Sequence, residues 1–250
     1  MEAAISTDPR PVLRISWWGD SLVAAGEAYA PALDDPYGLP PVGTAVTVTR
    51  WRYRGFAHLV EVALQARLPG TDIRGVNHGA GGATSADVRA RIEAGPVPDA
   101  EFAVLGCGTN DAWGLPSSGA AAAEVRADYE RNLRRAVRAL RERAAAVVLL
   151  APPPVGWLPG ADTAALNDEL VRYGTVCAAV ARECGARFVD VRPRFTAVAR
   201  ELGMAPGVPP GAEVAAPWQG DGVHLSDLGN HLVAAAILRE LPGAQPDSAG

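Results

Sequence analysis

The sequence contains no lysine, and all 23 of its basic residues are arginine. The missing lysine amine excludes Schiff-base catalysis, a Ser–Lys catalytic pair and a phosphate-binding P-loop, because each of these uses that amine. Histidine is also scarce, with four residues and no H-x-x-x-H spacing. We therefore expect no metal site and no cofactor.

Long apolar runs are missing as well. No run approaches the roughly 18–20 residues that would cross a bilayer, and the N-terminal stretch is acidic and proline-containing where a signal peptide would be basic and apolar. The three cysteines, Cys107, Cys177 and Cys184, form no C-x-x-C pair, which disfavours a disulfide framework or a zinc ribbon. These absences predict a cytoplasmic protein without a membrane partner.

What is present indicates a globular protein. The chain has 250 residues, 48% of them hydrophobic, and a net charge of −5. An acidic balance of this kind gives no electrostatic footprint for nucleic acid. We expect a single domain over residues 1–241 and a disordered tail over 242–250. The sequence does not indicate an oligomeric state.

Short apolar runs of strand length alternate with helical stretches. The runs, typical of strands buried on both faces, lie at 12–18, 73–79, 102–108, 146–152 and 186–192. The helical stretches lie at 56–68, 85–94, 121–144, 165–184 and 226–241, with Ser226 placed as an N-cap. Because parallel strands need a crossover, this order predicts an α/β fold in which a parallel five-stranded sheet carries helices on both faces.

Two segments interrupt this alternation. Residues 27–53 and 200–220 are rich in proline and glycine. Long loops inside a domain are more often lids or binding loops than simple connectors. We interpret both segments as insertions at a binding site, and a surface insertion without function is the alternative.

Polar clusters follow the predicted strands at the points where they end. Gly-Asp-Ser-Leu occupies 19–22, a glycine-rich turn spans 77–84, Gly-Thr-Asn-Asp occupies 108–111, and Asp-Gly-Val-His at 221–224 precedes the last helix. Ligands of parallel α/β sheets bind beyond the carboxyl ends of the strands. All four clusters are therefore expected at the edge where a ligand would bind.

The clusters together contain the groups that acyl transfer needs. A serine hydroxyl such as Ser21 becomes a nucleophile when a histidine takes its proton and a carboxylate orients that histidine. His224 and Asp221 are close enough in the chain for the carboxylate to hold one imidazole nitrogen while the other faces Ser21. Backbone N–H groups of Ser21 and of the glycine-rich turn, with the Asn110 amide, could stabilise the developing oxyanion.

The order of these motifs resembles the GDSL or SGNH hydrolase superfamily over nearly the whole chain, about residues 12–241. The resemblance implies a three-layer α/β/α sandwich, flavodoxin-like, that acts on esters or thioesters without a metal. By motif position it implies Ser21 as nucleophile, His224 as base and Asp221 as its orienting carboxylate. It further implies an oxyanion hole of the Ser21 N–H, the Gly82 N–H and the Asn110 side chain, with Gly81 as the alternative to Gly82.

The sequence departs from the family pattern at Val23-Ala24-Ala25, where relatives often carry a threonine or serine, and at the long 27–53 insertion. Three tryptophans, Trp113, Trp157 and Trp218, follow the third, fourth and fifth strands. Indole faces suit sugar rings and aromatic groups, so we interpret these residues as substrate-binding. A role in capping the core beneath the long loops is the alternative.

Each motif alone is compatible with an ordinary turn or helix cap. Cys107 lacks a paired base and is interpreted as core, His58 and His231 as helix residues, and His78 as a candidate pocket residue. We hypothesise a serine esterase that cleaves a small-molecule carboxylic ester through an acyl-enzyme. An acyltransferase that passes the acyl group to a small alcohol, and a catalytically inactive binding module, are the alternatives.

Overall fold

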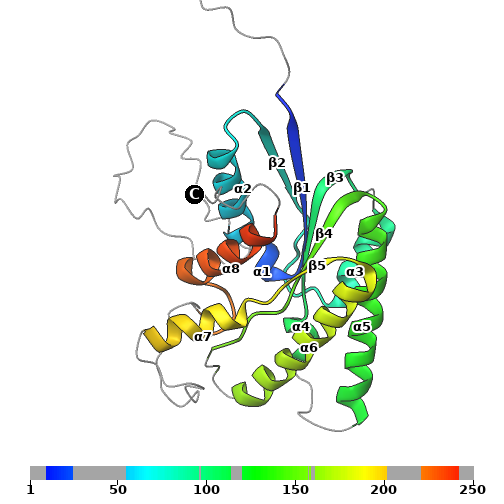
Figure 1. Cartoon of the computed structure of the whole chain (residues 1–250). Coiled ribbons are helices and arrows are strands. Elements are labelled where there is room, and N and C mark those ends of the chain that lie inside the picture. Colours follow the sequence, from blue (N-terminus) through cyan, green and yellow to red (C-terminus); the bar gives the residue numbers. More distant parts are fainter. Residues whose placement is uncertain are drawn as a thin grey trace, which may run out of the picture.

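The computed structural model of the chain describes residues 10–24, 55–95, 97–113, 120–156, 158, 161–201 and 221–241. Within these residues one parallel sheet has the strand order β2-β1-β3-β4-β5 (Figure 1). The strands are β1 (Val12–Gly19), β2 (Asp72–Asn77), β3 (Ala100–Gly106), β4 (Ala144–Leu150) and β5 (Arg187–Val189). This is the strand order of flavodoxin-like folds, so the predicted sheet is confirmed.

Helices cover both faces of the sheet. They are α1 (Ser21–Ala24), α2 (Gly55–Arg67), α3 (Ser85–Ala94), α4 (Thr109–Ala112), α5 (Ala120–Arg141), α6 (Thr163–Cys184), α7 (Arg192–Glu201) and α8 (Asp227–Glu240). Figure 1 shows α3, α5 and α6 on one side of the strands and α2, α7 and α8 on the other. The expected three-layer α/β/α sandwich is confirmed.

The strand sequences produce this layering because consecutive side chains of a strand point to opposite faces. In β1, Trp17 belongs to the core beneath α2, α7 and α8, whereas Trp18 belongs to the core beneath α3, α5 and α6. In β3, Val104 and Leu105 divide between the two cores in the same way. Strands that are apolar on both faces therefore need a helical layer on each side.

Capping residues specify where helices begin. Thr84 accepts a hydrogen bond from the Asp87 N–H and Asp87 accepts one from the Thr84 N–H, which is a complete capping box for α3. The predicted N-cap Ser226 is also present, since its Oγ accepts the Gly229 N–H at the start of α8. These local contacts satisfy N–H groups that a helix leaves unpaired at its first turn.

The predicted strand over 186–192 is too long. Strand β5 ends at Val189, and Asp190 Oδ1 accepts the Arg192 N–H at 3.0 Å, where α7 begins. Proline is favoured in the first turn of a helix because its missing N–H has no partner there, and Pro193 occupies that turn. An acidic cap followed by proline therefore starts a helix where the apolar pattern alone continued the strand.

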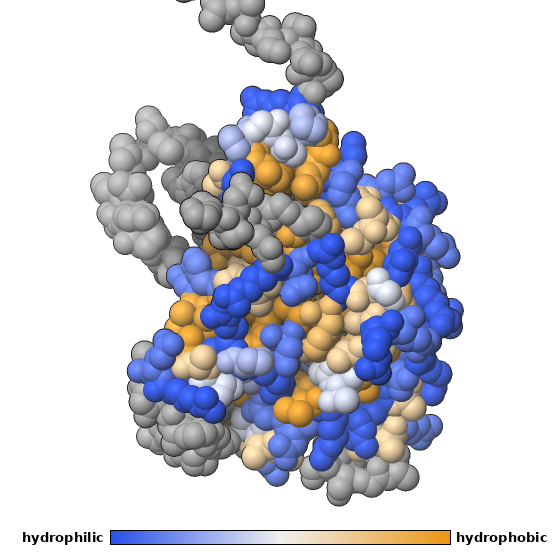
Figure 2. Space-filling view, in the orientation of Figure 1, coloured by the Kyte–Doolittle hydropathy of each residue, from blue (hydrophilic) through white to orange (hydrophobic). Residues whose placement is uncertain are grey.

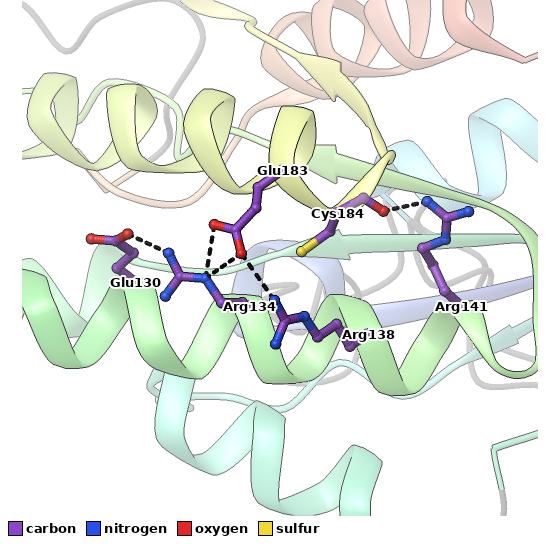
Figure 3. Close-up of polar contacts among 6 residues, drawn as sticks. All are labelled: Glu130, Arg134, Arg138, Arg141, Glu183 and Cys184. Carbon is purple, nitrogen blue, oxygen red and sulfur yellow. Dashed lines mark hydrogen bonds and ion pairs between the residues drawn. The ribbon is translucent and has the colours of Figure 1, made fainter.

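Ion pairs join the outer surfaces of α5 and α6. Arg134 and Arg138 both donate to the Glu183 carboxylate at 2.9 Å, and Arg134 also contacts Glu130 (Figure 3). Arg141 donates to the Cys184 carbonyl at the end of α6. Figure 2 shows mainly hydrophilic residues on the side of the molecule where α5 lies. Arg134 and Arg138 of α5 are therefore paired with glutamates and do not leave a uniformly basic surface.

Several predictions fall on residues that the structure does not describe. The 27–53 segment, residues 202–220 of the second segment and the 242–250 tail lie outside the described residues, so their interpretation stays a prediction. The domain assignment over 1–241 also stays a prediction. None of the helices in the described part of the chain has the length and apolar character that a membrane span requires.

Candidate active site

The turn after β1 presents Ser21 at the carboxyl edge of the sheet. At Gly19 a Cβ atom would lie 2.0 Å from the Gly106 carbonyl oxygen, so the close approach of β1 and β3 requires glycine there. Asp20 then donates its N–H to that carbonyl at 3.3 Å, and its Oδ1 accepts the Leu22 N–H at 2.9 Å. These contacts place Ser21 as the first residue of α1.

The structure brings Ser21, His224 and Asp221 together, although the first two are 203 residues apart. The His224 Nε2 lies 3.0 Å from Ser21 Oγ, and its Nδ1 lies 2.6 Å from Asp221 Oδ2. Asp221 Oδ1 accepts the N–H groups of Val223 and His224 at 2.9 and 2.7 Å. One carboxylate therefore closes the loop at 221–224 and also holds the ring.

The same contacts keep the Asp221 carboxylate ionised. Its burial would raise the pKa, but the hydrogen bonds from the His224 ring and from the N–H groups of His224 and Val223 outweigh burial and lower the pKa below its usual value. An ionised carboxylate accepts a proton-bearing Nδ1, which leaves the lone pair of Nε2 toward Ser21. In that tautomer the ring can take a proton from the serine hydroxyl.

The glycine-rich turn between β2 and α3 is fastened to the Ser21 turn. Asn77 Nδ2 donates to the Val23 carbonyl at 2.8 Å, and the Ala80 N–H donates to the Gly19 carbonyl at 3.0 Å. Gly82 has φ of +71°, which favours glycine, and nothing lies within 4 Å of the position its Cβ would take. Gly81, the alternative donor, is not among the glycines with positive φ.

The Gly-Thr-Asn-Asp loop after β3 contacts this turn. Gly108, with φ of +132°, packs against the Tyr129 ring and precedes α4, and Tyr129 donates its O–H to the Cys107 carbonyl at 2.9 Å. Asn110 Nδ2 donates one hydrogen bond to the Ala83 carbonyl at 2.9 Å. An amide nitrogen carries two N–H donors, so a second donor of Asn110 is available to a ligand.

Two carboxyl groups, one buried and one partly buried, lie beside these loops, and the sequence motifs did not assign a role to either of them. Burial raises the pKa of Asp20 to about 7, and the nearby Asp111 adds to this shift. Burial also raises the pKa of Asp111 above its usual value. Their positions inside the Gly-Asp-Ser-Leu and Gly-Thr-Asn-Asp motifs were the only available signal, because burial depends on how separate loops pack.

Of the remaining predicted residues, some lie in the described part of the chain and two do not. Trp113 follows α4 and is 48% exposed, whereas Trp157 and Trp218 lie outside the described residues. His78, which belongs to the glycine-rich turn, stacks on Trp18 with ring centroids 4.0 Å apart. Cys107 is buried, and burial raises the pKa of its thiol well above the usual value, which disfavours a thiolate nucleophile.

Comparison with known proteins places this geometry in a family. Residues 18–232 match the model of the GDSL-like lipase/acylhydrolase family. The acetylxylan esterase of Geobacillus stearothermophilus is 29% identical over 191 residues, which cover 75% of this chain and 80% of that protein. The crystal structure of Axe2, an acetylxylan esterase from the same organism, superposes with a TM-score of 0.63 at 27% identity, over 91% of this chain and 93% of Axe2.

Further solved structures agree with this result. Axe2 variants in which a serine, an aspartate or a histidine is replaced by alanine are described as catalytic mutants. An α/β hydrolase from the metagenome of Lake Arreo, Spain, shares the fold with a TM-score of 0.64 at 22% identity, over 94% of this chain and 97% of that chain. The chain therefore belongs to the GDSL-like lipase/acylhydrolase family and is a carboxylic ester hydrolase.

Proposed function

We propose that the chain hydrolyses its ester through an acyl-enzyme, with Ser21 as nucleophile, His224 as general base and Asp221 as the carboxylate that orients the histidine. The observation that carries this proposal is the continuous chain of contacts, 3.0 Å from Ser21 Oγ to His224 Nε2 and 2.6 Å from Nδ1 to Asp221. Both distances are within hydrogen-bond reach without any rearrangement of the chain. The Axe2 catalytic mutants support it, since their replaced aspartate and histidine are also three residues apart.

Ser21, His224 and Asp221, together with one water molecule, account for every bond and proton that the reaction moves. Ser21 Oγ forms a bond to the ester carbonyl carbon while its proton passes to His224 Nε2. The bond to the leaving alcohol oxygen then breaks, and that oxygen takes the proton from Nε2. A water molecule attacks the acyl-enzyme in the same way and gives its proton to His224. The bond between the acyl carbon and Ser21 Oγ then breaks, that oxygen takes the proton back from His224 Nε2, and the free acid is released. Asp221 stays ionised throughout and stabilises the imidazolium that forms twice.

The oxyanion of each tetrahedral intermediate needs donors that are already in place. We assign this role to the Ser21 N–H, the Gly82 N–H and the Asn110 amide. The left-handed backbone at Gly82, the open space beside it and the link from Asn110 to Ala83 support the assignment. The loss of one such donor typically lowers kcat by about 10²- to 10³-fold.

For the substrate we propose an acetyl ester of a carbohydrate. The relatives named above are acetylxylan esterases. In this chain Trp113 lies three residues beyond Asn110 with 48% of its surface exposed, so an indole face is available to a sugar ring near the proposed oxyanion hole. An acetyl group and a sugar would thus be recognised at neighbouring positions.

Replacing the nucleophile tests the mechanism. We expect Ser21→Ala to lower the hydrolysis of p-nitrophenyl acetate by roughly 10⁵-fold or more and to abolish labelling by a fluorophosphonate. Ser16→Ala is the matched control, because Ser16 is a buried β1 serine whose Oγ has no hydrogen-bond partner among the described residues. Hydrolysis or labelling that persists in Ser21→Ala, while Ser16→Ala behaves as the wild type, would remove the proposed mechanism.

A second experiment tests the substrate. Acetylated xylo-oligosaccharides are incubated with the wild type and with Trp113→Ala, and released acetate is measured beside p-nitrophenyl acetate hydrolysis. Loss of the indole face should raise KM for the oligosaccharide by roughly 10-fold and leave KM for the small ester unchanged. If an alcohol is added and the acetyl group is transferred to it rather than released as acetate, the alternative function, an acyltransferase, would be indicated instead.

A further inference from the structure

Asp111 joins the two loops that carry the proposed oxyanion donors. Its carboxylate accepts the Ser85 N–H, at 2.8 and 3.1 Å to its two oxygens, and the Ser85 hydroxyl at 2.5 Å. Ser85 is the first residue of α3, directly after the glycine-rich turn that contains Gly82. Asp111 is the neighbour of Asn110 in the chain. The contact therefore links the two loops at one residue from Asn110 and three residues from Gly82.

The Asn110 loop needs such a contact because α4 has only four residues. A helix of one turn is unstable by itself, since its nucleation cost is not recovered by further hydrogen bonds. Its N-cap, Gly108, offers no side-chain hydrogen bond. Tertiary contacts therefore set the direction of the Asn110 side chain. Three hydrogen bonds join Asp111 to Ser85, whereas one joins Asn110 to Ala83.

The helix on the far side reinforces this contact. Asn132, a buried residue of α5, donates to Ser85 Oγ at 3.1 Å, and Arg89 of α3 donates to Asn132 Oδ1 at 3.1 Å. Because Asn132 donates to Ser85 Oγ, the serine hydroxyl hydrogen is directed toward Asp111. Asp111 is therefore held in place by helices α3 and α5, through Ser85 and Asn132, and not by its own loop alone.

We propose that Asp111 is a positioning residue that clamps the Asn110 loop to the Gly82 turn and so sets the separation of the two oxyanion donors. This inference rests on the proposed function, because it assigns Asp111 a role only through Asn110 and Gly82. A displacement of about 1 Å in a reacting geometry can lower the rate by about 10²-fold. Asn110 already uses one N–H on Ala83, so without the clamp a single side chain must both hold the loop and bind the oxyanion.

The first test separates binding from catalysis. We expect Asp111→Ala to lower kcat on p-nitrophenyl acetate by roughly 10- to 100-fold with KM changed less than about threefold, and Asp111→Asn to recover most of the loss because an amide can still bond to Ser85. Asp87→Asn is the matched control, since Asp87 caps the same helix α3 through hydrogen bonds to Thr84 and its influence on Asp111 is electrostatic. An equal loss of kcat in Asp87→Asn would overturn the proposal.

The second test is a double-mutant cycle with Asn110→Ala. If Asp111 acts through Asn110, adding Asp111→Ala to Asn110→Ala lowers kcat by less than about threefold, whereas a general structural role gives multiplied losses and overturns the proposal. Ser85→Ala removes the hydroxyl bonds to Asp111 and from Asn132 but keeps the bonds from the Ser85 N–H, so it serves as a milder variant if Asp111→Ala does not fold. In the Asn110→Ala background its loss should vanish as well. An unchanged kcat in Asn110→Ala alone would refute the proposed oxyanion hole. This outcome differs from the one that refutes the role of Asp111, so the two proposals can fail separately.

Discussion

Replacement of Asp20 by asparagine should change how the stability of the protein depends on pH. Asp20 is 2% exposed, directly beside Ser21, and burial raises the pKa of its carboxyl group from 3.8 to about 7. The Leu22 N–H opposes this shift and the nearby Asp111 adds to it. Asparagine has the size of the neutral carboxyl group and keeps an oxygen that can accept the Leu22 N–H.

The sign and size of the effect follow from this shift. Between about pH 4 and pH 7 the folded chain holds a proton at Asp20 that the unfolded chain has released, so the free energy of unfolding falls as the pH rises through this window. It becomes independent of Asp20 above pH 7. A difference of about three units corresponds to about 4 kcal/mol. Asp20→Asn should therefore match the wild type near pH 4 and exceed its stability by up to about 4 kcal/mol at pH 8.

Urea unfolding at pH 4.5, 6, 7 and 8.5 measures this difference. Other titrating groups are shared by the two proteins, so the difference between their unfolding free energies isolates Asp20 and its coupling to Asp111. Asp99→Asn is a suitable control, because the Asp99 side chain is 81% exposed, and it should follow the wild-type curve. A difference between Asp20→Asn and wild type that stays constant across the pH range would refute the reasoning.

Two further predictions concern the turn and the helical layer. Gly82→Ala should lower the free energy of unfolding by about 1 kcal/mol and reduce kcat, because φ of +71° strains any residue that has a side chain. Gly81→Ala should lower both quantities less. Equal effects of the two substitutions in the unfolding and activity assays would contradict this prediction. Glu169 is 5% exposed and binds Arg126 and Arg172, whereas Glu183 is 43% exposed. Glu169→Ala should therefore lower the free energy of unfolding by about 2 kcal/mol, and Glu183→Ala by less than about 1 kcal/mol. The opposite order in urea unfolding would contradict this prediction.

Most of the helices and strands, and the edge of the sheet at which the site lies, could be predicted from the amino-acid sequence. Apolar runs with strand or helix periodicity set the elements to within a few residues, as with α3 at Ser85–Ala94. Because parallel strands end at one edge, the motifs after β1, β2 and β3 had to meet there. Strand β5 was the exception, since α7 starts at a hydrogen bond from the Arg192 N–H to Asp190 and at a proline in its first turn, neither of which apolar periodicity encodes.

Which side chains contact one another depends on how the elements pack. The 3.0 Å contact between Ser21 and His224 joins residues 203 positions apart, and it depends on the strand order and on how α8 packs. The burial that raises the pKa of Asp20 and the bonds from Asp111 to Ser85 likewise arise between separate loops. Periodicity reports which face of an element is apolar, but distances and desolvation depend on the neighbours that packing supplies.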